Sequence, residues 1–237
     1  MDAATTHLLA RASLYHMLAT AYDYPGPTQR ERIVASLNRA APLLEAYGGP
    51  WPRAAAELRT VLEEARQAPI EAEFNLLFAG TVECPPHETA YEPDVFRRQR
   101  ALADLAGFYE AFGFRLADDS RWQLDHLGVE LDFCAAVLQR HARARAEGWE
   151  EPAVVCAEAV RVFLEDHTGR WCAAFSRRLA RSASTPYYVT VAALTGAWIH
   201  AELLALGVDP DPLADRPRGA PEDEASPSCG GCPVAAG

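Results

Sequence analysis

The chain has 237 residues, of which 49% are hydrophobic and 23% charged, as in soluble globular proteins. Its formal net charge of -11 argues against nucleic-acid binding, because a nucleic-acid binder needs a basic surface to neutralise phosphates. Ala, Leu and Arg are abundant, β-branched residues are sparse, and apolar residues recur at spacings of three and four. These features predict an all-α fold.

Apolar stripes and helix-stopping residues divide the first half of the chain into helical segments. A cap at Thr5 or Thr6 is expected to open a helix that Pro25 ends. The Cys84-Pro85-Pro86 sequence disfavours helix and therefore predicts a loop that closes at Tyr91. Further helices are expected over residues 28–40, 53–67, 69–79 and 93–113.

The second half of the chain also has helical periodicity. Asp118, Asp119 and Ser120 offer N-caps to a long helix that is expected to reach about Ala146, where Gly148 follows. Gly169 is expected to break the chain between the next two helices. These later helices are predicted from Pro152 to about His167, across Trp171 to Leu179, and over residues 187–206.

The segment 187–206 is apolar nearly all round and about as long as a membrane span. His200 and Glu202 lie inside it, and no basic cluster flanks either end. We therefore expect this segment to be a central buried helix of a bundle, without stable membrane insertion.

The composition changes after Asp209, where Pro, Asp, Glu, Ser and Gly replace the apolar residues. Such a segment cannot bury enough apolar surface to offset the entropy lost on ordering. We expect residues 1–209 to form one domain, a bundle of about eight to ten helices, and residues 210–237 to form a flexible tail. The N-terminal sequence lacks the features of a secretory signal, so a cytoplasmic location is expected.

The six cysteines fall into two groups. Cys84, Cys134, Cys156 and Cys172 are scattered singly, which is typical of reduced, buried thiols. Cys229 and Cys232 form a C-x-x-C pair in the predicted tail and are weak candidates for a metal or redox site. No second pair or nearby histidine completes a tetrahedral zinc site there, so no cofactor is expected.

Asp125, His126 and Glu130 form a cluster of titratable residues. On a helix, His126 and Glu130 are one turn apart on the same face. This pair could hold the imidazole partly charged or present a carboxylate to a guanidinium; alternatively, it is a hydrogen bond at the edge of the core. The sequence lacks H-E-x-x-H, G-x-S-x-G, the phosphate-binding G-x-x-x-x-G-K-[ST] and G-x-G-x-x-G, so no enzyme is expected.

Three ordered motifs resemble the TorD/DmsD/NarJ family of redox-enzyme maturation chaperones. They are E-x-x-x-L-F-x-G from Glu73 to Gly80, P-P-x-x-[ST]-x-Y from Pro85 to Tyr91, and D-H-x-x-x-E-L-x-F from Asp125 to Phe133. The later Trp171, Phe175, Leu179 and Pro186-Tyr187-Tyr188 are similar to the C-terminal half of that family. The resemblance covers roughly residues 8 to 206. The chain departs from it at Glu88-Thr89-Ala90-Tyr91, where relatives often carry Gly-Ser-Val-Tyr.

The resemblance implies an all-helical cytoplasmic chaperone for a molybdopterin oxidoreductase catalytic subunit. Such a protein binds the N-terminal, often twin-arginine, leader and the apo subunit, aids cofactor insertion and delays export. The C-terminal tail is similar to those of chaperones serving dimethyl-sulfide, ethylbenzene, selenate or chlorate enzymes. The resemblance assigns peptide binding to Phe74, Leu77, Phe78, Pro86, Tyr91, Asp125 and His126.

The residues themselves are compatible with such a site. A leader combines arginines with an apolar segment, so its receptor needs carboxylates beside an apolar groove. Asp125 and Glu130 would supply the carboxylates, and Leu77 and Phe78 the apolar wall, if the two segments lie side by side. Plain core packing is the alternative for Leu77 and Phe78.

Two other functional classes stay open at this stage. One is a metal- or nucleotide-binding helical protein that uses Cys229 and Cys232 or the Asp125-His126 cluster. The other is a small-molecule enzyme whose site residues converge only in the fold. A monomer or a domain-swapped dimer is expected, and the sequence does not identify the client.

Overall fold

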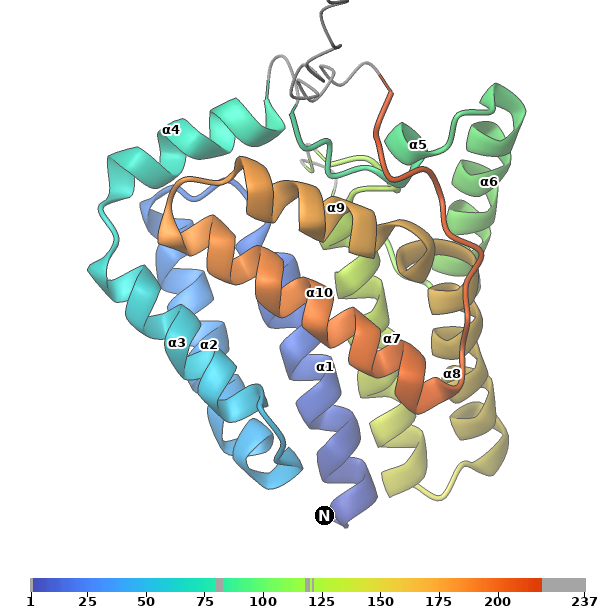
Figure 1. The fold of residues 1–237 in the computed structure, drawn as a ribbon. Coiled ribbons are helices and arrows are strands. Elements are labelled where there is room, and N and C mark those ends of the chain that lie inside the picture. Colours follow the sequence, from blue (N-terminus) through green and yellow to red (C-terminus); the bar gives the residue numbers. More distant parts are fainter. Residues whose placement is uncertain (1, 80–82, 118–119, 121, 219–237) are drawn as a thin grey trace, which may run out of the picture.

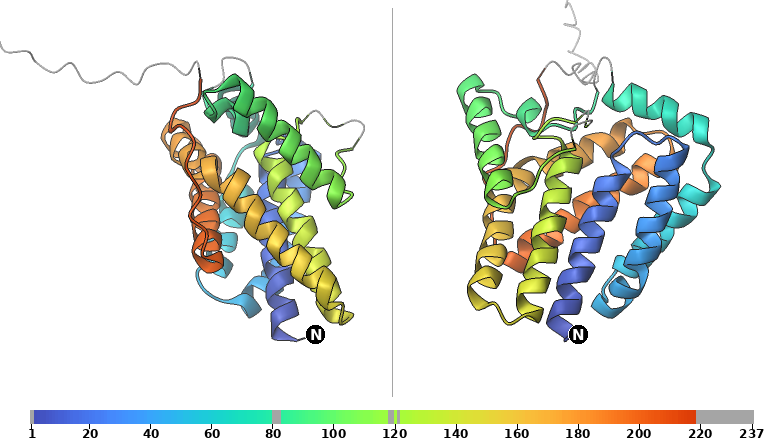
Figure 2. Two further views of the ribbon diagram at one scale, coloured as in Figure 1. Left: turned by 90° about the vertical axis from the view of Figure 1, so that its right-hand side faces the viewer. Right: turned by 180° about the vertical axis from the view of Figure 1, so that it is seen from behind.

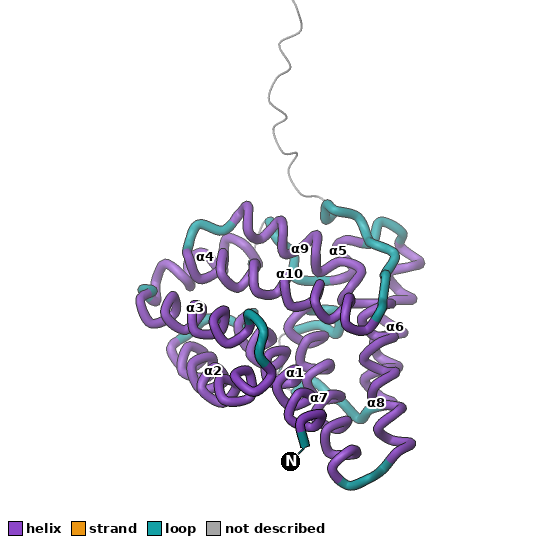
Figure 3. The backbone as a smooth tube through the Cα atoms, turned by 60° about the horizontal axis from the view of Figure 1, so that its bottom comes forward, coloured by secondary structure: helices purple, strands orange, loops and turns teal. Residues whose placement is uncertain are grey.

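The computed structural model describes residues 2–79, 83–117, 120 and 122–218. Within them every regular element is a helix, which confirms the all-α prediction, and the tube view shows helices joined by loops (Figures 1 and 3). The elements are α1 (Ala3–Ala21), α2 (Pro27–Tyr47), α3 (Trp51–Glu64), α4 (Gln67–Phe78), α5 (Glu88–Tyr91), α6 (Val95–Ala111), α7 (Leu127–Ala146), α8 (Glu150–Phe163), the π-helical turn η1 (Leu164–Thr168), α9 (Gly169–Ser182) and α10 (Pro186–Leu206).

The helices form two layers. Seen from behind, α8, α7, α1 and α2 stand side by side in one row (Figure 2). α9 and α10 cross in front of this row, and α3 packs against both α2 and α10 (Figure 1). α4, α5 and α6 lie at one end of the row, where the segment between α4 and α6 meets the start of α7.

Aromatic side chains fill the core between the layers. The largest buried rings belong to Tyr15, Tyr22, Tyr91, Phe133, Phe163, Trp171, Phe175, Tyr187, Tyr188 and Trp198. Arg11 of α1 donates to both carboxylate oxygens of Glu202, with an Nε to Oε1 distance of 2.9 Å and an Nη2 to Oε2 distance of 2.8 Å. This bidentate pair explains how α10 accommodates a buried acid in an apolar sequence.

α10 is not enclosed on all sides, contrary to the prediction of a central buried helix. It is long and apolar enough for a membrane span, but only 39% of its most hydrophobic window is buried. Its inner face carries Tyr188, Thr195 and Trp198, whereas Val189 and Leu204 are exposed. The outer face also includes the small residues Ala193 and Ala197.

Four predicted helix boundaries were wrong. Asp2, rather than Thr5 or Thr6, caps α1, because its side chain accepts a hydrogen bond from Thr5 N. Gly169 does not break the chain, because α8, η1 and α9 follow one another without a gap. α2 continues through Pro42 to Tyr47, because buried Leu37 and Leu44 anchor it on both sides of the proline. α7 begins at Leu127 rather than after Ser120, and the predicted caps Asp118 and Asp119 lie outside the described residues. The chain just before α7 instead makes backbone hydrogen bonds to the loop at residues 86–88.

The chain after α10 continues along the bundle. Leu213 N donates to Arg170 O at 2.9 Å, and Arg218 N donates to Ala90 O at 3.0 Å. Residues 210–218, which were expected to start the flexible tail, therefore extend the domain beyond residue 209 and connect α9 to α5. The rest of the predicted tail, with Cys229 and Cys232, lies outside the described residues. The other four cysteines are free and buried, as expected.

Candidate functional site: the α5–α7 junction and the α6 groove

The segments that carry the second and third motifs lie side by side. His87 and His126 form an isolated antiparallel β-bridge. Glu88 N donates to Asp125 O at 3.0 Å, and Leu127 N donates to Pro86 O at 2.8 Å. We call this contact the α5–α7 junction; it confirms that the segment ending at Tyr91 lies beside the segment starting at Asp125, through residues 86–88 rather than through Leu77 and Phe78.

Asp125 is enclosed within this junction. Its Oδ2 accepts hydrogen bonds from the Thr89 hydroxyl at 2.6 Å and from Thr89 N at 3.2 Å, and its Oδ1 lies 3.1 Å from His87 Nδ1. Burial raises the pKa of Asp125, but the hydrogen bonds from His87 and Thr89 outweigh it and hold the pKa below its ordinary value. The carboxylate is therefore charged, and its side chain has no surface open to solvent.

His126 caps α7 and is neutral. Its Nδ1 accepts a hydrogen bond from Gly128 N at 3.1 Å, and its ring stacks on Trp122 with centroids 4.2 Å apart. Burial lowers the pKa of His126 to about 3, with the nearby His87 acting in the same direction. The possibility of a partly charged imidazole near neutral pH was therefore wrong, because the buried ring has no room for solvation of the cation.

Glu130 points into a second buried cluster, away from Asp125. Its Oε2 accepts hydrogen bonds from Thr168 Oγ1 at 2.8 Å and from Trp171 Nε1 at 3.2 Å. Burial raises the pKa of Glu130 well above its ordinary value, and the neighbouring Glu88 raises it further. Glu130 thus has a fully buried, neutral carboxyl group rather than an exposed carboxylate beside a groove.

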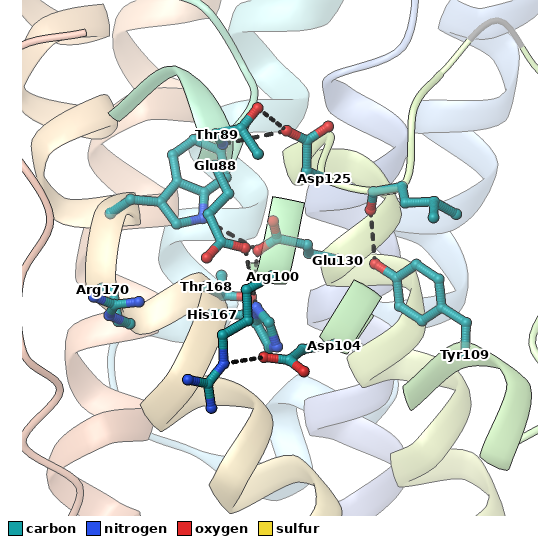
Figure 4. Close-up of polar contacts among 12 residues, drawn as sticks. Glu88, Thr89, Arg100, Asp104, Tyr109, Asp125, Glu130, His167, Thr168 and Arg170 are labelled. Carbon is teal, nitrogen blue, oxygen red and sulfur yellow. Dashed lines mark hydrogen bonds and ion pairs between the residues drawn. The ribbon is translucent and has the colours of Figure 1, made fainter. Parts of the chain in front are cut away.

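The second cluster is completed by residues that the sequence did not single out. The carboxylate of Glu88 lies 3.0 Å from His167 Nδ1, and the acidic groups of Glu88 and Glu130 converge from α5 and α7 (Figure 4). His167 and Thr168 belong to η1, where the α-helical ladder is interrupted. A Cβ on the adjacent Gly169 would lie 2.2 Å from Leu164 O, so only glycine fits after this turn.

The apolar residues predicted to contact peptide belong to the core. Leu77 is fully buried, and Phe74 packs edge-on against Tyr24. Phe78 is half-buried and stacks on Phe175. Tyr91 packs on Trp171, and Pro86 is also buried. The alternative of core packing therefore describes Leu77, and these residues position the junction instead of forming an open wall.

A hollow of about 480 Å³, lined by His87, Thr89 and Arg218 among others, adjoins the junction. Two further hollows adjoin the junction and are open to solvent. The larger, which we call the α6 groove, has a volume of about 870 Å³ and lies between α6 and η1. Its lining includes Glu88, Glu92, Asp104, Phe108, Asp166 and His167. The smaller, of about 420 Å³, lies between α1 and the start of α7; it is lined by His16, Asp23, Arg32, Trp122, His126 and Asp132, among others.

Metal binding has no support in the described part of the chain. No group of three or more His, Cys, Asp or Glu side chains there has an arrangement that could hold a metal ion, and this includes the Asp125-His126 cluster. The C-x-x-C pair falls in the undescribed part of the tail.

Comparisons with known proteins cover this region of the chain. The model of the nitrate reductase delta subunit family matches residues 45–177, which include the junction, α6 and η1. The selenate reductase assembly chaperone protein of Thauera selenatis is 34% identical over 142 residues, which make up 58% of this chain and 70% of that protein. The chlorate reductase assembly chaperone protein of Ideonella dechloratans is 36% identical over 120 residues, 49% of this chain and 60% of that protein. Chaperone protein YcdY of Escherichia coli K12 is 28% identical over 148 residues, 61% and 70% of the two chains.

Proposed function

This chain belongs to the nitrate reductase delta subunit family, that is, the TorD/NarJ-type maturation chaperones, and on this premise we propose that it assembles a molybdopterin oxidoreductase. In this proposal it binds the N-terminal, twin-arginine leader and the apo form of the catalytic subunit in the cytoplasm. It thereby aids cofactor insertion and delays export until the subunit is complete.

The observation that carries the proposal is the position of the α5–α7 junction. It lies within the matched region, and it joins the second and third motif segments into one hydrogen-bonded unit between the α6 groove and the hollow beside α1. A binding protein needs fixed walls around a recognition surface, because a preorganised surface loses less entropy when a peptide docks. The junction supplies this rigidity at the place where α4, α5, α6 and α7 meet.

In this proposal the buried motif residues do not contact the peptide. They hold in place the elements that line the hollows. Asp125 and Glu130 are inaccessible to a peptide arginine in this structure, so their role is to fix α5 and η1. His126 lines the smaller hollow, and Phe78 is half-buried beside the junction. Of the predicted residues, Phe78 is the most exposed, whereas the His126 ring is buried behind the surface of this hollow.

Co-purification tests the proposal in its simplest form. We would co-express this chain, carrying an affinity tag, with the catalytic subunit of a molybdopterin oxidoreductase from the same genome. A second culture would produce the same subunit without its leader. We expect the full-length apo subunit to co-purify in a stoichiometric complex and the leaderless subunit to be retained less. If neither form is retained, the assignment to this client is wrong.

A further inference from the structure

The α6 groove has two walls of different elements. α6 supplies Asp104 and Phe108 on one side, and η1 supplies Asp166 and His167 on the other. Figure 4 shows Asp104 and His167 from these two walls. Glu92, which follows α5, closes one end. Most of the residues of α6 face solvent, and its inner side rests on the bundle through rings such as Phe108, whose centroid lies 5.3 Å from that of Phe163.

Some of the charged side chains in the groove have hydrogen-bond or ion-pair partners, and others do not. Four carboxyl groups and three guanidinium groups line it: Glu88, Glu92, Asp104 and Asp166, and Arg97, Arg100 and Arg170. Arg100 pairs with Asp104 at 3.6 Å, and Arg170 Nε donates to Asp211 O at 2.9 Å. Asp166 is exposed and makes no hydrogen bond or ion pair with any described residue. An exposed carboxylate without a partner among the described residues is therefore presented on the wall formed by η1.

The floor of the groove contains a buried hydrogen-bonding atom without a partner. His167 is 2% exposed, and its Nε2 makes no hydrogen bond within the described structure. The other ring nitrogen lies 3.0 Å from the Glu88 carboxylate, and in the neutral ring a proton on Nδ1 that is donated to Glu88 makes Nε2 an acceptor. An unsatisfied buried acceptor is unfavourable, so a donor that enters the groove would gain this hydrogen bond.

We infer that the α6 groove binds an arginine side chain of the client segment. A guanidinium has several donors in a planar fork, so it can pair with the Asp166 carboxylate while directing other donors toward His167 Nε2. The ring of Phe108 offers the cation a π face beside them. The inference rests on the proposed function, because it names the part of the client that this groove recognises.

The alternative occupant is an anion such as phosphate. Two of the three arginines in the groove already have partners, and the atom presented by His167 is an acceptor. An anion would also meet the exposed carboxylate of Asp166 at close range. These contacts favour a cation, and the net charge of -11 draws one toward the protein.

A pair of synthetic peptides provides the probe. One has two arginines followed by a six-residue Leu/Ala segment, and the other has glutamines in place of the arginines. Both would be titrated into the full chain and three variants by fluorescence anisotropy. Asp166→Lys reverses the charge on the groove wall. Glu45→Lys makes the same charge change at an exposed site on α2, far along the chain from the groove. His167→Asn keeps a group near the Nδ1 position and removes Nε2.

We expect Asp166→Lys to bind the arginine peptide at least about tenfold more weakly than the parent, and Glu45→Lys to lose less than about twofold through general charge. His167→Asn should lose about fivefold, with an unchanged circular dichroism spectrum as the check on folding. The glutamine peptide should bind weakly and equally to all four proteins. Equal losses in the two lysine variants, or equal affinity for the two peptides, would overturn the groove assignment. If the peptide titrations overturn the groove assignment while the client subunit still co-purifies with the parent chain, the proposed function stands and only the groove assignment fails.

Discussion

The hydroxyl of Thr89 donates a hydrogen bond of 2.6 Å to Oδ2 of Asp125, across 36 residues of sequence. The bond connects α5 to the residue just before the cap of α7. Glu88, the residue before Thr89 in α5, contacts His167 of η1. The four-residue helix α5 is thus the element through which the junction and the floor of the α6 groove are linked.

Removing the Thr89 hydroxyl tests the contribution of this bond to stability. Thr89→Val keeps the shape of the side chain but leaves the buried, charged Asp125 with one donor fewer. We expect a loss of about 1 to 3 kcal/mol in the free energy of unfolding, measured by urea denaturation. Thr89→Ser should recover most of it. Thr60→Val removes an exposed hydroxyl on α3 and should cost less than about 0.5 kcal/mol. Similar losses at positions 89 and 60 would contradict the role of the bond.

The buried neutral His126 predicts a loss of stability at acid pH. Its pKa is about 3 in the folded protein and near 6.5 when unfolded, so between these values only the unfolded chain takes up the proton. Stability should therefore fall as the pH is lowered from about 6.5 toward 3, by on the order of 4 kcal/mol in total. His126→Asn keeps a capping acceptor for Gly128 N and does not titrate. Its unfolding free energy should change less between pH 6.5 and 4.5; an identical pH profile for parent and variant would contradict this account.

Glu130 predicts the opposite dependence on pH. Because its pKa is raised in the folded protein, the folded state keeps its proton while the unfolded chain releases it above its ordinary pKa. This contribution to stability is present at low pH and is lost as the pH rises toward the folded pKa. Glu130→Gln retains an oxygen for Thr168 and Trp171 without an ionisable group. At pH 8 it should be at least as stable as the parent, whereas Glu130→Ala should lose about 2 to 4 kcal/mol. Equal losses in the two variants would contradict a neutral Glu130.

Two helical glycines give a matched test of the π-helical turn. A methyl group at Gly169 would collide with Leu164 O, whereas one at Gly107 on α6 has open space. Gly169→Ala should lower the free energy of unfolding by about 2 kcal/mol or more, because the backbone must shift. Gly107→Ala should raise it by about 0.5 to 1 kcal/mol through helix propensity. Thermal and urea unfolding would measure both changes, and a stabilising Gly169→Ala would show that η1 is not required.

Helix-forming and helix-ending residues predicted the helical fold well, because their effect depends only on neighbours a few residues away. Asp94 caps α6 close to the predicted helix start at residue 93, and Gly207 ends α10 with the positive φ that glycine permits. The start of α7 was mispredicted because residues 123–127 exchange backbone hydrogen bonds with residues 86–88 and with their own turn. No local pattern reports such a distant pairing.

The candidate site was predicted only in part, for the same reason. The motifs indicated which segments meet, but not which way their side chains point. Glu130 turns inward because its hydrogen-bond partners, Thr168 and Trp171, lie 38 and 41 residues further along the chain. His167 looked like an ordinary helix end, and a π-helical turn depends on tertiary packing that periodicity does not encode. The one sequence signal for this turn was Gly169 after His167 and Thr168, and a glycine at that place resembles a helix stop.

Leader binding is the central claim, and calorimetric titration tests it most directly. The titrant is the leader peptide of the catalytic subunit used for co-purification, with a related chaperone and its own leader as the positive control. We predict saturable binding of one leader per chain, and weaker binding when the leader's arginines are changed to glutamine. Absence of binding by this chain, while the control chaperone binds its leader under the same conditions, would contradict the account.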